Sequence, residues 1–199
     1  MAGLSSAWRL SLAAIMGVSL ASSGLAADPP SRAAAIAAAD AAAGVPEAPV
    51  DPNIAVCTTP PPSGEKLAGD MKLADEGHAM SFSNGGGGDA IVKLRHAKTN
   101  KLAASFLLRK MEEMTVEGVP DGEYIIQYAF GRTLAPDCRS FIRIIRANQL
   151  PETDALKTTV IDDADHTEVR RMSVSYELSV TETSNVKPVS IDAATFNAD

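Results

Sequence analysis

The arginines of the C-terminal half are the side chains whose type and spacing best suit ligand recognition. Arg132, Arg139, Arg143 and Arg146 fall within fifteen residues of an otherwise acidic chain. If the chain around Phe141 is a strand, Arg139, Phe141 and Arg143 share one face. Guanidinium groups beside an aromatic ring can hold a carboxylate or a sugar acid there. The alternative is that these arginines only neutralise nearby acids on a sheet surface.

A second candidate is the densest group of oxygen and nitrogen ligands in the sequence, Asp162, Asp163, Asp165 and His166. Such a run can hold Ca²⁺ or a transition metal, but it lacks the glycine and the distal glutamate of a calcium loop. A solvated turn is the alternative. The glycines at 85–88 predict a flexible hairpin tip, because no Gly-Lys-Ser/Thr follows them as in a phosphate-binding loop.

The histidines form no recognisable catalytic or metal-binding motif. His78, His96 and His166 are far apart, with no His-x-x-x-His pair, and the chain has no Gly-x-Ser-x-Gly elbow. We therefore expect no cofactor. Paired carboxylates of a hydrolase depend on distances in space, so the sequence leaves that alternative open.

Cys57 and Cys138 are the only cysteines. In an exported chain two thiols are expected to pair, which would tie the end of a linker to the loop at 135–137. Two free thiols, or pairing with another chain, are the alternatives.

The N-terminal residues have the pattern of an export signal. Arg9 precedes an apolar run at 10–20, and small residues follow up to Ala26 and Ala27. We expect a signal peptide over 1–26, cleaved after Ala26, and a periplasmic or secreted protein. The run is too short to span a bilayer, so no membrane span is expected after cleavage. An uncleaved anchor or a buried helix is the alternative.

The charge balance excludes some partners. The chain has 18 Lys plus Arg against 25 Asp plus Glu, and removing residues 1–26 takes away one arginine, which gives 17 minus 25, or −8. Nucleic acids and anionic membranes reward a concentrated basic surface, which is not visible here. We expect neither as a partner.

The remaining chain divides into a linker and one domain. Residues 27–62 are rich in Ala and Pro and are expected to be disordered. From 63 to 199, apolar and polar residues alternate with a period of two, which predicts strands. About seven or eight short strands separated by turn residues indicate an antiparallel β-sandwich. A short helix is expected around Leu67 and Met71. The expected strands are 79–83, 90–94, 102–108, 114–117, 124–130, 141–146, 156–161 and 169–180.

Residues 114–131 resemble the hairpin of the transthyretin-like, carboxypeptidase-regulatory-like β-sandwich domains. Val119, Pro120, Gly122, Tyr124 and Gly131 occupy the positions of that motif, in which a Pro-x-Gly-x-Tyr turn leads into a strand that ends on glycine. The resemblance covers about a quarter of the chain, and the region from Phe141 onward is not covered by it. It implies a non-catalytic accessory or interaction module, with no functional residues to carry over.

These features together favour an exported, non-catalytic binding or assembly module of the cell envelope. Its partner would be an envelope protein or an acidic glycan. A small envelope hydrolase on the same β-sandwich scaffold and a purely structural spacer domain are the alternatives. A hydrolase should show a cleft with converging acids or a His–acid pair, whereas a binding module should show an exposed apolar or arginine-rich patch.

Overall fold

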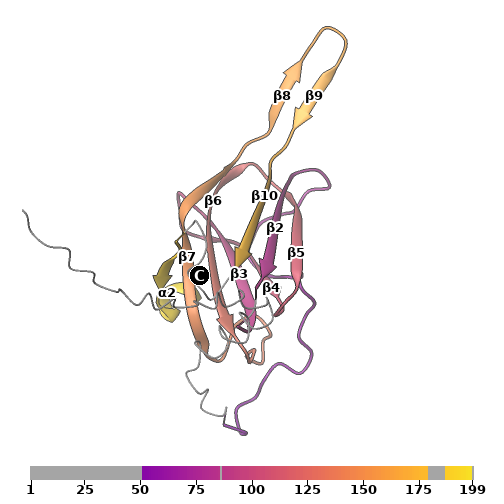
Figure 1. Cartoon of the computed structure of the whole chain (residues 1–199). Coiled ribbons are helices and arrows are strands. Elements are labelled where there is room, and N and C mark those ends of the chain that lie inside the picture. Colours follow the sequence, from indigo (N-terminus) through magenta and orange to yellow (C-terminus); the bar gives the residue numbers. More distant parts are fainter. Residues whose placement is uncertain (1–50, 86, 179–186, 199) are drawn as a thin grey trace, which may run out of the picture. The chain divides into compact units, whose positions relative to one another are not determined.

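The computed structural model describes residues 51–85, 87–178 and 187–198. The predicted signal peptide and residues 27–50 of the predicted linker lie outside the described residues. Within the described ranges the chain is almost entirely β, with two facing sheets and a separate hairpin (Figure 1). The predicted antiparallel β-sandwich is confirmed.

The large sheet has six antiparallel strands in the order β1-β4-β3-β6-β7-β11. The smaller sheet has three strands in the order β10-β2-β5, in which β10 runs parallel to β2. The strands of the large sheet are β1 (Lys66–Ala68), β3 (Asp89–His96), β4 (Leu102–Leu108), β6 (Gly122–Gly131), β7 (Ile144–Leu156) and β11 (Val189–Ile191). Those of the smaller sheet are β2 (His78–Asn84), β5 (Glu113–Val119) and β10 (Ser173–Leu178). The separate hairpin pairs β8 (Thr159–Asp162) with β9 (Thr167–Arg170).

The main core lies between the two sheets and follows from the alternation of side chains along each strand. Val92 of β3, Phe106 of β4 and Phe130 of β6 meet Phe82 of β2 there, all at most 1% exposed. Tyr124 and Tyr128 of β6 also lie there and are 1% and 3% exposed. Tyr176 of β10 is half-buried and stacks on Phe82 with ring centroids 5.4 Å apart.

A second core covers the opposite face of the large sheet. Ile91 and Leu107 point to that face, where Phe141 and Phe196 pack against them. Phe196 belongs to α2 (Ala193–Asn197), which begins where the Asp192 carboxylate accepts a hydrogen bond of 2.8 Å from the Thr195 amide. Strands β3 and β4 are therefore buried on both faces.

The sequence-based strand boundaries hold for β2 to β6 and fail after residue 140. The strand expected at 141–146 starts at Ile144 and runs on through Pro151, and the one expected at 156–161 straddles β7 and β8. The strand expected at 169–180 is divided between β9 and β10, because its two halves pair with different partners. The helix expected around Leu67 is instead the short strand β1.

Candidate ligand-binding site

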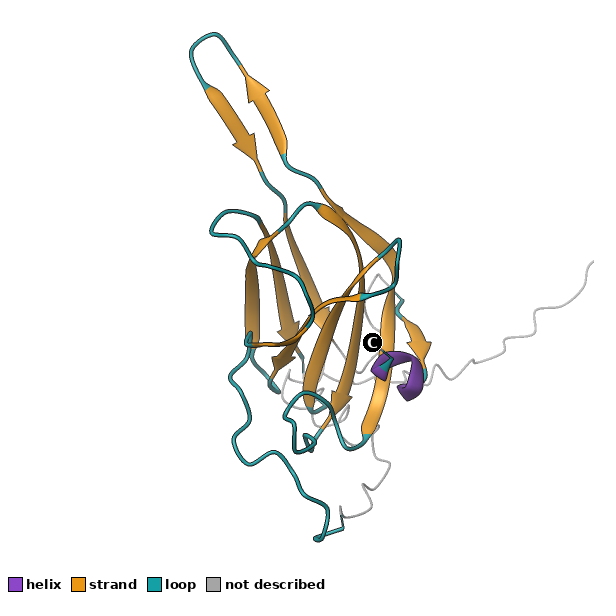
Figure 2. Ribbon diagram, turned by 180° about the vertical axis from the view of Figure 1, so that it is seen from behind, coloured by secondary structure: helices purple, strands orange, loops and turns teal. Residues whose placement is uncertain are grey.

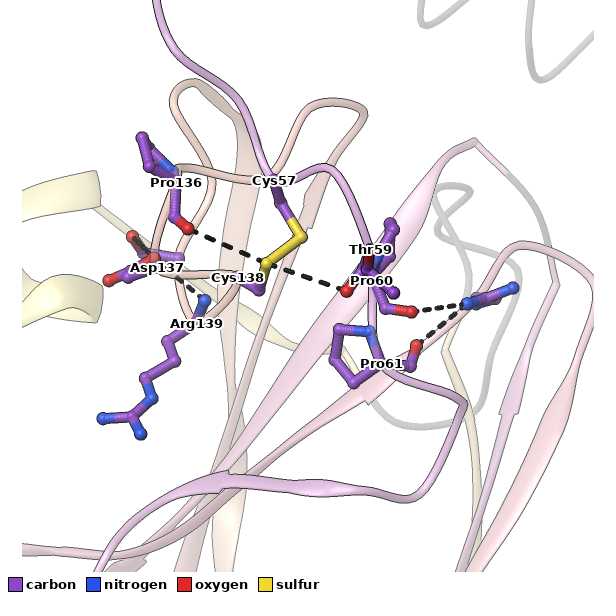
Figure 3. The surroundings of a disulfide bond; sticks show 10 residues. Cys57, Thr59, Pro60, Pro61, Pro136, Asp137, Cys138 and Arg139 are labelled. Atoms are coloured by element: carbon purple, nitrogen blue, oxygen red, sulfur yellow. Dashed lines mark hydrogen bonds between the residues drawn. A yellow bond between two sulfur atoms is a disulfide. The ribbon is translucent and has the colours of Figure 1, made fainter.

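The predicted disulfide is confirmed and organises the site. Cys57 and Cys138 are bonded with their Cα atoms 5.1 Å apart (Figure 3). The bond ties the segment before β1 to the loop between β6 and β7, and the Cys57 amide also donates to the Leu134 carbonyl at 3.1 Å. In the same segment the carbonyls of Pro60 and Pro61 each accept from Arg109 at 3.0 Å. The last residues of the predicted linker thus lie against the sandwich.

The loop that carries Cys138 directs Arg139 outward. The Asp137 carboxylate accepts a hydrogen bond of 2.9 Å from the Arg139 amide and one of 3.4 Å from the Ser140 hydroxyl. This local turn leaves the Arg139 side chain pointing away from the disulfide (Figure 3). Its guanidinium group has no hydrogen-bond or ion-pair partner among the described residues.

Arg139 lines a cavity of about 420 Å³ between this loop, the large sheet and α2. The sheet contributes Lys93 of β3 and Ser105 of β4, which are direct cross-strand neighbours. Ser140 of the loop and Phe196 of α2 also line it. Residues from three distant parts of the chain thus build one polar cavity.

Lys93 is a buried cation in this cavity, with only 7% of its surface exposed. Alternation along β3 places Val92 and Leu94 in the main core and Lys93 on the opposite face. Its Nζ donates a hydrogen bond of 2.8 Å to the Phe196 carbonyl and lies 4.8 Å from the centre of the Phe196 ring. Lys93 therefore helps to hold Phe196 of α2 against the sheet, and it contributes a positive charge to the lining of the cavity.

Arg95 extends this positive region beneath α2. It is 2% exposed, and it donates to the Gln127 side chain at 2.8 Å, to the Asn100 carbonyl at 3.0 Å and to the Phe196 carbonyl at 3.3 Å. It also donates to the carbonyl of Ala198. The carbonyl end of α2 thus faces two buried cations.

The cavity suits an anion. Lys93 and Arg139 bring two positive charges, whereas its one carboxylate, Asp137, already accepts two hydrogen bonds within the loop. The hydroxyl groups of Ser105 and Ser140 add donors that can also accept. A carboxylate with neighbouring hydroxyl groups matches this set of side chains.

Of the five residues predicted to bind a ligand, only Arg139 lines this cavity. Phe141 is 5% exposed, and its ring covers Gly131 so closely that a Cβ there would lie 2.3 Å from it. The expectation that Arg139, Phe141 and Arg143 share one face of a strand is wrong. These residues lie in the loop between β6 and β7, where Phe141 is buried in the second core and the two arginines are exposed. The remaining predicted residues are exposed outside the cavity, namely Arg132, Arg143 and Arg146.

The predicted metal-binding residues lie in the turn of the β8–β9 hairpin. Asp162, Asp163, Asp165 and His166 are all exposed, and the Asp163 amide donates to the His166 carbonyl at 2.9 Å. Within residues 51–85, 87–178 and 187–198, no three His, Cys, Asp or Glu side chains form a group able to hold a metal ion. The geometry is that of a solvated turn.

A His–acid pair, the feature expected of a hydrolase, joins His78 and Asp121 at 2.9 Å. His78 is 0% exposed, and its Nδ1 accepts a hydrogen bond of 2.9 Å from the Met172 amide, so its Nε2 donates to Asp121. Thr158 donates to Asp121 through its hydroxyl at 2.6 Å and its amide at 3.0 Å. In a nucleophile–His–acid triad the histidine stands in the middle, whereas here the acid does.

These hydrogen bonds explain the electrostatics of the pair. The Thr158 hydroxyl, followed by His78, lowers the pKa of Asp121 to about 2. Both ring nitrogens of His78 are occupied inside the protein, so the ring cannot exchange a proton with a bound substrate. Asp121 also borders a larger cavity of about 630 Å³ with His96, whose Nε2 lies 3.8 Å from Asp70. We interpret His78 and Asp121 as a structural pair.

The sequence singled out the disulfide and Arg139, which lines the candidate cavity, but it did not single out Lys93 or α2. The sequence does contain a signal for the buried cations, because Lys93 and Arg95 alternate with the apolar residues Val92 and Leu94. A charged residue on a strand that is buried on both faces needs hydrogen-bond partners inside the protein. No residue pattern indicates that α2 supplies those partners.

Comparison with known proteins finds no family model, no curated protein and no solved structure that matches the chain. In the described part of the chain no helix is long and apolar enough to cross a membrane. The disulfide is compatible with a location outside the cytoplasm.

Proposed function

We propose that the chain is a non-catalytic binding module of the cell envelope that holds the carboxylate of an acidic glycan in the cavity beside α2. The observation that carries this proposal is that the Arg139 guanidinium, which has no partner in the described part of the chain, lines the same cavity as the buried Lys93. Location in the envelope rests on the predicted signal peptide and is supported by the disulfide.

The size and lining of the cavity favour one acidic sugar residue. A volume of about 420 Å³ lies at the lower end of the range for small-molecule sites. Arg139 can hold a carboxylate through two parallel hydrogen bonds. Ser105, Ser140 and Asn197 offer partners for sugar hydroxyls, and the partly exposed Leu102 offers apolar surface for the sugar ring.

The test is calorimetric titration of the oxidised protein with galacturonic, glucuronic and N-acetylneuraminic acids, with galactose as the neutral control. Hydrogen bonds to a charged group are worth about 1.5–3 kcal/mol, so Arg139→Ala should weaken binding of the acids by about 10- to 100-fold. Arg143→Ala is the matched control, because Arg143 is exposed but does not line the cavity. It should leave the affinity unchanged.

Two results contradict the proposal. Equal affinity of the wild type for galactose and the sugar acids would show that charge is not recognised. Equal loss in Arg139→Ala and Arg143→Ala would show that the cavity is not the site and that only the overall charge of the surface matters.

A further inference from the structure

The β8–β9 hairpin extends beyond the two sheets and pairs with neither of them (Figures 1 and 2). All residues of β9 are exposed, and in β8 only Ile161 is partly covered. A hairpin of two strands has little stability of its own in water, because it buries almost no apolar surface. Its conformation must therefore be supported at its base, by further contacts, or by both.

The base of the hairpin is held by both chain segments that enter it. Thr158, just before β8, donates two hydrogen bonds to Asp121. Met172, just after β9, donates to His78, and its carbonyl accepts from the Ala79 amide at 3.1 Å. The pair of buried His78 and exposed Asp121 thus links both arms to the sandwich, which orients the hairpin.

The outer edge of β9 offers free backbone groups. The Asp163 amide bonds to the His166 carbonyl, and hydrogen-bonded pairs alternate along an antiparallel ladder. In the register of the hairpin, Glu168 with Ile161 is therefore the next hydrogen-bonded pair, and the peptide groups of Val169 point outward. No strand of the described chain pairs with this edge.

The side chains of β9 make this edge complementary to itself. Val169 is 44% exposed and lies opposite Val160, which is 55% exposed. On the other face Arg170 donates two hydrogen bonds to Glu168, at 2.7 and 2.9 Å. Glu168 and Arg170 lie on either side of Val169. A second antiparallel copy of β9, related by a two-fold axis at Val169, would therefore place its arginine opposite Glu168 and its glutamate opposite Arg170.

We propose that β9 pairs antiparallel with β9 of a second copy of this chain about a two-fold axis at Val169. The Val169 amide and carbonyl bond to those of Val169 of the partner subunit. Glu168 then lies opposite Arg170 of the partner subunit, and the reverse pair forms by symmetry. The two hairpins become one four-stranded sheet, in which Val160 and Val169 of both copies form a continuous apolar stripe.

The same pairing through β8 is less favourable. An axis at Val160 places Thr159 opposite Ile161 of the partner subunit, which supplies no charge complement. The β9 edge is thus the one that specifies its partner.

Engineered cysteines test the register in the full chain, which keeps its native disulfide. Antiparallel hydrogen-bonded pairs have Cα atoms about 5.5 Å apart, within the range of a disulfide. Val169→Cys should therefore cross-link two copies under mild oxidation, as seen on a non-reducing gel. Val160→Cys is the matched control: Val160 is more exposed than Val169, but two such sites are separated by about 14 Å across three strand spacings. Equal cross-linking of the two variants, or none in Val169→Cys, would overturn the proposal.

Charge exchange tests the complementarity independently. Glu168→Arg and Arg170→Glu each place like charges opposite one another, so each variant alone should show a dimer dissociation constant raised by about tenfold or more in sedimentation equilibrium. An equimolar mixture of the two restores both opposite-charge pairs and should dimerise like the wild type. Asp162→Arg, an equal charge change on β8, should dimerise normally. A wild type that remains monomeric at about 1 mM, or a mixture no better than the single variants, would refute the pairing.

Discussion

Removal of the Cys57–Cys138 bond should lower the free energy of unfolding by more than the few contacts around the bond contribute. The two cysteines are 81 residues apart, and the loop they close contains β1 to β6. The chain-entropy relation gives about 4.5 kcal/mol at 25 °C for closing a loop of this length in the unfolded chain. This contribution acts on the unfolded state, so it is present even though Cys57 lies in a segment without regular secondary structure.

Contacts that survive without the bond limit the loss. The Cys57 amide still donates to Leu134, and Arg109 still donates to the carbonyls of Pro60 and Pro61. These contacts keep the segment partly in place but close no covalent loop. We therefore expect the double variant Cys57→Ala, Cys138→Ala to lose between about 2 and 4.5 kcal/mol of unfolding free energy.

Urea denaturation of the oxidised wild type, the reduced wild type and the double variant separates the effect of the bond from that of the substitutions. The reduced wild type should resemble the double variant, because both lack the closed loop. Arg139 follows Cys138 directly, so affinity for sugar acids should also fall in both. A double variant with the urea midpoint of the oxidised wild type would refute the reasoning.

Three further substitutions test the polar pair and the two cores. The pKa of Asp121 is lowered from 3.8 to about 2, so the carboxylate stabilises the fold above about pH 4 and this stability is lost as the pH falls toward 2. Asp121→Asn should flatten the dependence of the urea midpoint on pH in that range. Phe141→Ala should cost about 3–5 kcal/mol in urea denaturation, since the ring is buried against Gly131. Tyr176→Ala should cost about 3 kcal/mol in the same assay, because the ring stacks on Phe82 and the hydroxyl hydrogen-bonds Asp154.

The sequence predicted those strands in which every second side chain enters the main core. The side chains between them face either solvent or the second core. Strand β6 shows this clearly, since Tyr124, Ile126, Tyr128 and Phe130 all point into the main core. Strand β7 was only partly found, because Pro151 and several exposed polar residues interrupt its pattern. The division between β9 and β10 was missed because a period of two reports which face is buried and not which strand is the partner.

The site was predicted in part for a similar reason. Arg139 stood out by composition alone, but the position of its neighbours depends on which turns the loop adopts. Phe141 was expected beside it on a strand face and is instead enclosed by the second core. Lys93 and Phe196 are 103 residues apart, and only the docking of α2 on the large sheet brings them together.

The buried cations and α2 stabilise one another, and this links the fold to the proposed site. A helix of five residues is too short to be stable alone, and its last carbonyls have no partners within the helix. Buried cations, in turn, are tolerated only when acceptors surround them. Lys93 and Arg95 donate to the carbonyl of Phe196, so each side satisfies a requirement of the other. A carboxylate bound by Arg139 would enter next to this contact, because Lys93 and Phe196 line the same cavity. Lys93, which helps to hold α2 in place, thus also brings a positive charge to the cavity in which the ligand would bind.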